Sequence, residues 1–158
     1  MAKKSKPTSS SHIKSFFDDF PDFVPEPPAG LRENFARLAA HRQWKNGSKN
    51  YKRNWNKYVR MEFDSEFGTN YTRLESWQNL CTELGIERLP SITQCKKALS
   101  VVNVNIVDLM DCRRSGKKPR LFSSLNALRK YTKENDLFFP RDAAKEEGFV
   151  KILLKHIL

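Results

Sequence analysis

The chain has 158 residues, with 29 Lys and Arg against 18 Asp and Glu, which gives a formal net charge of +11. This length predicts one domain with its own hydrophobic core and argues against a multidomain enzyme. No apolar run approaches the roughly 18 residues that a membrane span needs, so we expect no membrane partner. The positive charge fits a polyanion, such as DNA or RNA, or an acidic protein, without choosing between them.

The N-terminal segment has three lysines in its first six residues and no apolar stretch of the kind that a secretory signal contains. We therefore expect an intracellular chain in which residues 1–12 form a disordered basic tail and residues 13–158 form a single helical domain. The spacing of the three cysteines supports neither a zinc site nor a disulfide framework, so we expect no metal and no cofactor. These cysteines are expected to be small apolar residues on helices: Cys81, Cys95 and Cys112.

Apolar side chains at Ile13, Phe16, Phe17 and Phe20 repeat with helical spacing and predict a first helix that Pro21 ends. Residues 21–28 then contain four prolines. We expect this segment to form an extended strap that packs on the main body through two apolar side chains. These side chains are Phe23 and Val24.

Three longer helices are expected next, at about 29–44, 49–64 and 72–84, each with one apolar face. Ser48 is a suitable N-cap for the second of these helices, because its hydroxyl can accept from an exposed backbone amide. Asn70 or Thr72 could cap the third, and Gly85 suits the position just after its end.

The C-terminal half predicts shorter helices. Ser91 should cap one of them, and Ser123 or Ser124 should cap another. Between these two, a helix over about 104–112 competes with a strand, because the run 101–107 is rich in β-branched residues.

A helical turn after Pro140, with Ala143 and Ala144, and a final helix from Phe149 to Ile157 complete the pattern. Helix signals outnumber strand signals along the whole chain. The sequence therefore predicts an all-α fold, a single-domain array of about seven to eight short helices with a Pro/Phe-rich N-terminal strap.

The basic residues are concentrated in three segments. Residues 1–14 carry a net charge of +4, residues 41–60 carry +7 and residues 113–120 carry +5, and none of these segments contains an acidic residue. The rest of the chain therefore has a net charge of −5. We expect a partner that requires positive charge to bind at a patch and not over the whole surface.

The two internal basic segments supply the predicted nucleic-acid-binding residues, because cations can neutralise phosphates while neighbouring aromatics stack bases. These residues are Arg42, Trp44, Lys45, Lys49, Lys52, Arg53, Lys57, Arg60, Arg113, Arg114, Lys117, Lys118 and Arg120. A simpler interpretation of 41–60 is a helix with an aromatic stripe in the core and cations in water. We expect Trp55 and Tyr58 in the core, whereas core packing and base stacking are both open for Trp44. The segment 113–120 is expected to be an exposed loop that serves as a nuclear-import signal or a phosphate contact.

Other kinds of site find less support in the sequence. Residues 91–115 could form a helix-turn-helix, but Asp108 and Asp111 in its second helix would repel DNA phosphates. The three histidines belong to no recognised catalytic motif, and the six glycines form no phosphate-binding loop. We therefore expect a protein that is not an enzyme.

Several short segments, taken in order, are familiar: WQNLC at 77–81, VNIVDL at 104–109, RRSG at 113–116, LRKYT at 128–132 and FPRDAAK at 139–145. Together with 16–23, 34–38 and 153–158, they resemble a large group of small intracellular proteins of filamentous fungi. The resemblance extends over nearly the whole chain from about residue 15. It implies a self-contained domain that includes the strap, and it supplies no catalytic residues, because the group is functionally uncharacterised.

Two hypotheses of function follow. The first is a non-enzymatic nucleic-acid-binding protein, located in the nucleus, that uses the basic helix face and the basic loop. The alternative is an α-helical interaction module or adaptor that does not bind nucleic acid, with the strap or a groove beside it as the surface that binds an acidic protein.

Overall fold

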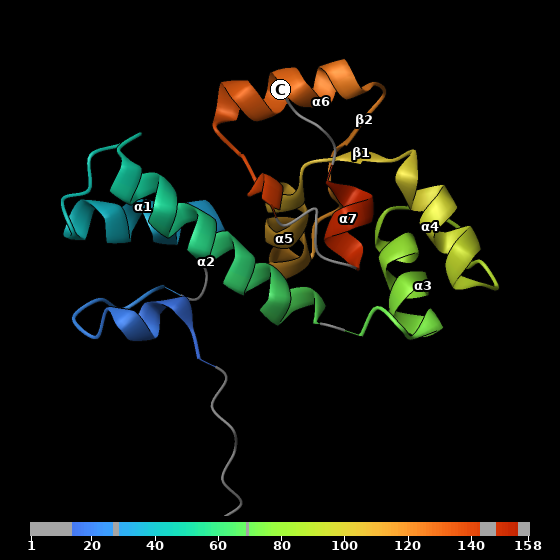
Figure 1. The fold of residues 1–158 in the computed structure, drawn as a ribbon, viewed down its shortest axis with the longest axis horizontal. Coiled ribbons are helices and arrows are strands. Elements are labelled where there is room, and N and C mark those ends of the chain that lie inside the picture. Colours follow the sequence, from blue (N-terminus) through green and yellow to red (C-terminus); the bar gives the residue numbers. More distant parts are fainter. Residues whose placement is uncertain (1–13, 27–28, 69, 143–147, 155–158) are drawn as a thin grey trace, which may run out of the picture.

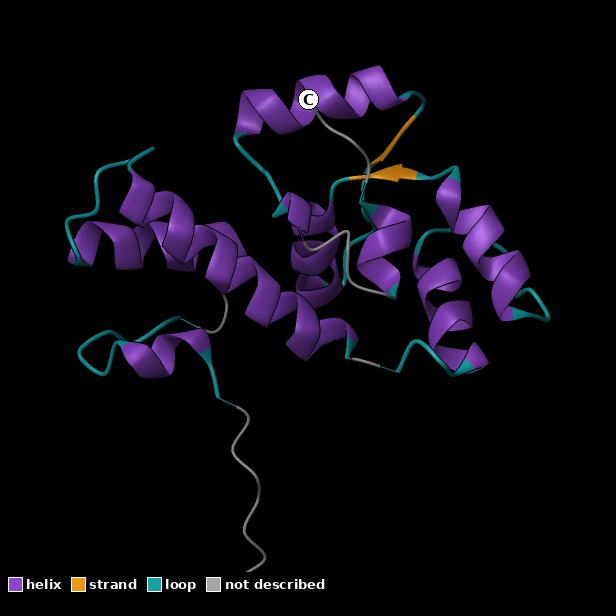
Figure 2. Cartoon of the chain, viewed as in Figure 1, coloured by secondary structure: helices purple, strands orange, loops and turns teal. Residues whose placement is uncertain are grey.

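Seven α-helices and a small two-stranded sheet form a single, mostly helical domain in the part of the chain that the computed structural model describes (Figures 1 and 2). This part comprises residues 14–26, 29–68, 70–142 and 148–154. The all-α prediction is therefore confirmed. The predicted tail at 1–12, Ile13, Ala143, Ala144 and the end of the predicted last helix lie outside the described residues. None of the helices in the described ranges has the length and apolar character to span a membrane.

The segment that the structure describes at 14–26, which we call the strap from here on, includes both the predicted first helix and most of the extended segment expected at 21–28. It begins with a short 3-10 helix, η1 (Phe16–Asp19), instead of the predicted longer α-helix. Ser15 forms a capping box there, in which its hydroxyl accepts from the Phe17 amide and its own amide donates to Asp18. Phe16 is fully buried against α2 (Lys49–Phe67), and the Phe23 ring stacks on that of Phe17. The prediction for Val24 is wrong, because this side chain is 78% exposed.

Helices α1 (Leu31–His41) and α2 form a hairpin that packs on the strap. Helix α1 is shorter than predicted at both ends, and Gln43, with a φ of 56°, turns the chain just beyond it. Ser48 caps α2 as predicted, because its hydroxyl accepts from the Tyr51 amide at 3.2 Å. The buried face of this hairpin contributes Leu31, Phe35, Leu38, Tyr58, Val59 and Phe63 to the core.

Helices α3 (Leu74–Glu83) and α4 (Ile92–Ser100) pack on each other at the other side of the domain. Ser91 caps α4 as predicted, and Gly85 has the positive φ of 75° expected after α3. The predicted cap of α3 is wrong, because Arg73 holds that position and makes no side-chain capping bond.

Helix α5 (Ile106–Ser115) lies between these two helix pairs (Figure 1). The strand β1 (Asn103–Val104) precedes it and pairs with β2 (Leu121–Phe122), so the helix starts later than predicted. The buried Asn105 side chain caps α5 by accepting from the Val107 and Asp108 amides. Helix α6 (Leu125–Asn135), capped by Ser124, then covers the sheet, and α7 (Phe149–Leu153) packs on α4.

Replacement of Ser48 by Ala is expected to lower the free energy of unfolding by about 1 kcal/mol, because the first turn of α2 loses its side-chain acceptor. For a chain of this size the melting temperature should fall by roughly 2–4 °C. Differential scanning calorimetry measures the change. The control is Ser65→Ala at an exposed position inside the same helix, where alanine should be neutral or slightly stabilising. Equal melting temperatures for the two variants would contradict this account of the cap.

Candidate functional site

Three of the basic side chains in segment 41–60 are neutralised by carboxylates. Arg42 lies 2.8 Å from Asp22, Lys57 lies 2.9 Å from Asp19, and Arg60 lies 3.2 Å from Asp142. Two of the three carboxylates belong to the strap. The strap therefore neutralises part of the basic surface that the sequence assigned to nucleic acid.

The charge of the strap carboxylates is stabilised by these contacts. Hydrogen bonds from Lys14 and then Lys57 lower the pKa of Asp19 to about 2. A hydrogen bond from His41 is the main cause that lowers the pKa of Asp22. Both carboxylates are therefore ionised at neutral pH and remain available to pair with the cations.

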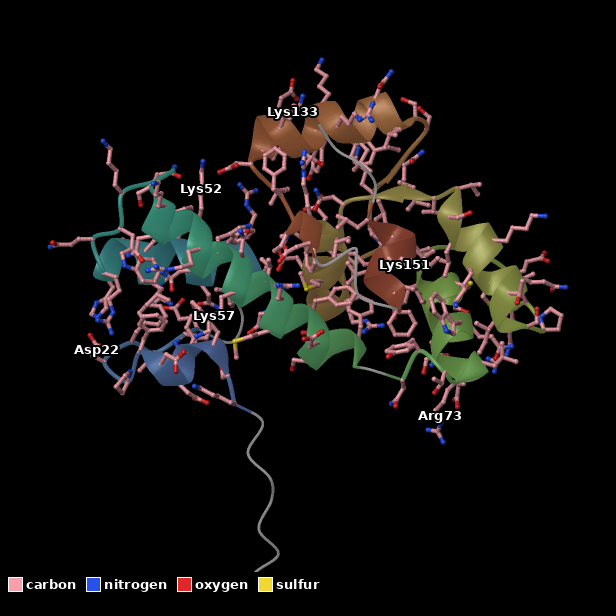
Figure 3. All side chains as sticks on the ribbon, in the orientation of Figure 1. Asp22, Lys52, Lys57, Arg73, Lys133 and Lys151 are labelled. Carbon is pink, nitrogen blue, oxygen red and sulfur yellow. The ribbon has the colours of Figure 1, made fainter. Side chains whose placement is uncertain are left out.

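Four cations lie in the connection between α1 and α2 and in the first turns of α2. All four are exposed, and none forms an ion pair with a carboxylate in the described ranges. In Figure 3, Lys52 projects from the side of α2 opposite to Lys57, which faces the strap. Arg53 is positioned by a hydrogen bond of 2.7 Å from its Nη2 to Asn50 Oδ1. We call these four the α2 cation cluster: Lys45, Lys49, Lys52 and Arg53.

The aromatic side chains of the same segment pack on protein. Tyr58 is fully buried, as predicted, and its hydroxyl donates to the Leu31 carbonyl at 3.1 Å. Burial raises the pKa of Tyr58 well above its usual value. Trp44 is half-buried, with edge contacts to Phe20 and a tilted contact to Phe35, so the structure favours core packing for it.

Beside the α2 cation cluster is a pocket of about 700 Å³ between α1, α2 and the segment that follows α6. Its aromatic lining includes Phe35, Tyr51 and Trp55, with the latter two rings edge-on to Phe35 at 5.1 Å. The Trp55 indole N–H donates to the Phe138 carbonyl at 2.9 Å, which joins α2 to the far wall. We call this the aromatic pocket, and Lys52 belongs both to it and to the cluster.

The aromatic pocket was not predicted. Its far wall comes from Asn135, Asp136 and Phe138, about 80 residues beyond Trp55 in the sequence. The helical spacing of Trp55 predicted a core position, whereas the residue is only half-buried against the core and lines the pocket. No local pattern around Phe138 indicates that it meets α2, because the contact depends on the path of the chain after α6.

The second basic segment divides into two parts. Arg113 stacks over the Phe67 ring at 3.9 Å, and it donates to the carboxylate of Glu83 and to the Glu66 carbonyl. Arg114 pairs with Glu62, and with Glu66 at 2.7 Å. The structure therefore places these two guanidinium groups inside a network that joins α5 to α2 and α3.

Lys117, Lys118 and Arg120 are exposed, and Arg120 also lies over the rings of Phe122 and Tyr131. This loop leads through β2 to the start of α6 (Figure 1). The aromatic pocket, in contrast, is lined by residues at and just after the end of α6. Helix α6 has 11 residues and is therefore about 16 Å long. Lys117 and Lys118 therefore lie in the loop before α6 and outside the lining of the pocket, whereas Arg120 reaches Tyr131 in the second half of the helix, and none of the three belongs to the α2 cation cluster.

The residues of the other candidate sites are buried or make structural contacts. The structure gives no support to α5 as a DNA-reading helix, because one face is buried and Arg113 and Arg114, its basic side chains, pair with carboxylates. In addition, Asp111 accepts from the Leu31 amide at 2.6 Å, at the start of α1. Cys81 and Cys95 are buried, and burial raises the pKa of the Cys81 thiol to about 12. Within the described ranges, His, Cys, Asp and Glu form no group of three or more that could hold a metal ion.

No family model matches the chain, and neither a curated protein nor a solved structure is similar enough to report.

Proposed function

We propose that this protein binds nucleic acid without catalysing a reaction and contacts the phosphates with the α2 cation cluster. One observation carries the proposal: these four cations are exposed together and have no carboxylate partner among the described residues, whereas most of the other predicted cations do. Unpaired cations attract phosphates and release condensed counterions when they bind. The half-buried aromatics beside the cluster add surfaces on which a base can stack.

The structure gives less support to the adaptor alternative, because the strap is already engaged. Phe16 is buried, and Phe17, Phe20 and Phe23 pack against the core. In the described ranges, the exposed large apolar side chains come from separate segments and form no obvious docking surface. These side chains are Val24, Val101, Leu121 and Phe138.

Nuclear location is part of the proposal and rests on a smaller basic signal than the sequence suggested. Arg113 and Arg114 are in α5 and bind carboxylates, so an import receptor would meet only the exposed cations that follow. These cations are Lys117, Lys118 and Arg120.

Salt dependence tests the proposal directly. Fluorescence anisotropy with a labelled oligonucleotide of about 20 nucleotides, measured from about 50 to 400 mM salt, should show affinity falling steeply. Four phosphate contacts predict a slope of log K against log salt concentration of about −3 to −4, since each contact contributes roughly −0.7 to −0.9. A nuclease-treated sample should retain the same affinity for added oligonucleotide. A slope near zero, or a stoichiometric acidic protein partner recovered in place of nucleic acid, would contradict the proposal.

A further inference from the structure

The aromatic pocket is large enough for a nucleotide and has aromatic walls on which a flat ring system can stack. It offers about 700 Å³, enclosed by Phe35, Tyr51 and Trp55 on the hairpin and by Phe138 beyond α6. Phe138 is 38% exposed, so one wall presents an open aromatic face to solvent. Every nucleobase can stack on such a face, whereas few other parts of a polyanion can.

Charge at the mouth of the pocket fits the phosphates that accompany a base. Lys52 lines the pocket, and Lys49 and Arg53 lie within one turn of it on the same helix. An unpaired base that enters the pocket would therefore bring its own phosphate, and those of its neighbours, to cations that have no described carboxylate partner. Within the lining itself, Glu33 and Asp136 offset Arg32 and Lys52, so the excess positive charge comes from Lys49 and Arg53 beside the pocket. This excess favours a nucleotide over an uncharged aromatic ligand or an acidic peptide.

The polar groups of the pocket include an acceptor that can distinguish bases. Asp136 follows α6 with a left-handed φ of 51° and lines the pocket together with Tyr51. Burial is the main cause that raises the pKa of Tyr51, and the charge of Asp136 adds to it. The guanidinium of Arg32 is fixed close by through a bond of 3.1 Å to the Asn135 carbonyl. A carboxylate has two acceptor oxygens, and guanine presents two adjacent donors, N1–H and the N2 amino group, to such a pair. Uracil has only one donor on the corresponding edge.

We propose that the aromatic pocket binds a single unpaired nucleobase, guanine in preference to uracil, so that the protein binds single strands more tightly than duplexes. This inference rests on the proposed function, because the phosphates of the strand are bound by the α2 cation cluster. A base inside a duplex is stacked on both faces and paired along one edge, so it cannot enter the pocket without the cost of flipping. A single strand meets no such cost.

The test is a titration of the full chain at about 0.1 M salt with four probes: an oligouridylate, the same oligomer with guanine at every third position, a duplex of equal length, and free guanosine monophosphate. The guanine-containing strand should bind roughly tenfold more tightly than the oligouridylate and the duplex. Asp136→Asn should abolish the preference for guanine, and asparagine keeps the left-handed backbone. The control Glu134→Gln makes the same change of charge two residues away on α6 and should preserve the preference.

A second variant tests the stacking wall. Phe138→Ala should weaken binding of both single strands by roughly 5- to 100-fold and leave duplex binding unchanged. Val101→Ala removes another exposed apolar side chain, away from the pocket, and should have no effect. Circular dichroism establishes that each variant keeps its helix content.

The outcomes separate the two proposals. Equal, salt-dependent binding of both strands and the duplex, unaffected by Asp136→Asn and Phe138→Ala, would overturn the pocket assignment and leave the proposed function in place. Binding of guanosine monophosphate as tight as that of the strand would overturn the single-strand assignment in favour of a free nucleotide. Failure of all four probes to bind would overturn both proposals.

Discussion

Reversing three members of the α2 cation cluster, with Lys49, Lys52 and Arg53 each changed to Glu, is expected to lower the affinity for an oligonucleotide by roughly 100-fold or more at 0.1 M salt. Each substitution removes an attractive contact with a phosphate and adds a repulsive one. The slope of affinity against salt should fall by about 2 to 3, since three contacts are lost. Fluorescence anisotropy measures both quantities.

The fold should tolerate this triple variant. All three side chains are exposed, and none forms an ion pair with a described carboxylate. Lys49 begins α2, where a glutamate is favoured by the helix dipole. Melting temperature and circular dichroism should therefore stay close to those of the original chain, so that a loss of binding reports on the surface alone.

The matched control reverses Lys117, Lys118 and Arg120, which gives the same change in net charge in the loop before α6. None of these three residues belongs to α2 or lines the aromatic pocket, so their reversal should leave the contacts of the cluster with phosphates intact. We expect less than a fivefold loss of affinity in the control. Equal losses in the two triple variants would mean that binding depends on net charge and not on this site.

The elements that the sequence predicted well are those with local causes. Ser48, Ser91 and Ser124 each cap a helix by accepting from the amide three residues further along, so cap and helix are visible in one short window. The apolar spacing of Phe35 and Tyr58 likewise indicated the buried faces of the hairpin, because a helix face repeats over a few residues.

The start of α5 shows how tertiary contacts alter a local pattern. Val104 fits the helical spacing, yet it pairs with Leu121 in the small sheet, a partner that the pattern around Val104 does not contain. Asn105 caps the helix instead and also donates to Thr132 Oγ1 and to the Leu137 carbonyl, both at 3.1 Å. An asparagine before Ile-Val-Asp is a recognisable cap signal, but the β-branched run around it supported two interpretations.

The candidate site was only partly predictable for the same reason. The sequence located the cations, but their carboxylate partners are distant: Glu83 is 30 residues from Arg113, and Glu62 is 52 residues from Arg114. Whether a cation is free or paired depends on these distant contacts and not on its own segment. The prediction was therefore most useful for Lys49, Lys52 and Arg53, whose segment contains no acidic residue and whose described surroundings supply no carboxylate partner.

The role of Arg113 can be tested by its effect on stability. Arg113→Met keeps an apolar side chain over Phe67 but removes the ion pair with Glu83 and the hydrogen bond to the Glu66 carbonyl. The side chains of Arg113 and Glu83 are only 26% and 31% exposed, so the glutamate would be left partly buried without its partner. We expect the free energy of unfolding to fall by about 2–3 kcal/mol, below the 3–5 kcal/mol typical of a fully buried pair. The melting temperature should fall by roughly 5–10 °C.

A nearby control and a double-mutant cycle make this test specific. Lys117→Met removes an equal charge from an exposed position in the same basic segment, and its stability should change by less than about 0.5 kcal/mol. Glu83→Gln combined with Arg113→Met should cost less than the sum of the two single variants, because each already breaks the same pair. The oligonucleotide affinity of folded Arg113→Met should equal that of the original chain, since this guanidinium faces carboxylates and not the α2 cation cluster. Unchanged stability together with a loss of affinity would return Arg113 to the nucleic-acid surface and would require the binding site to extend to α5.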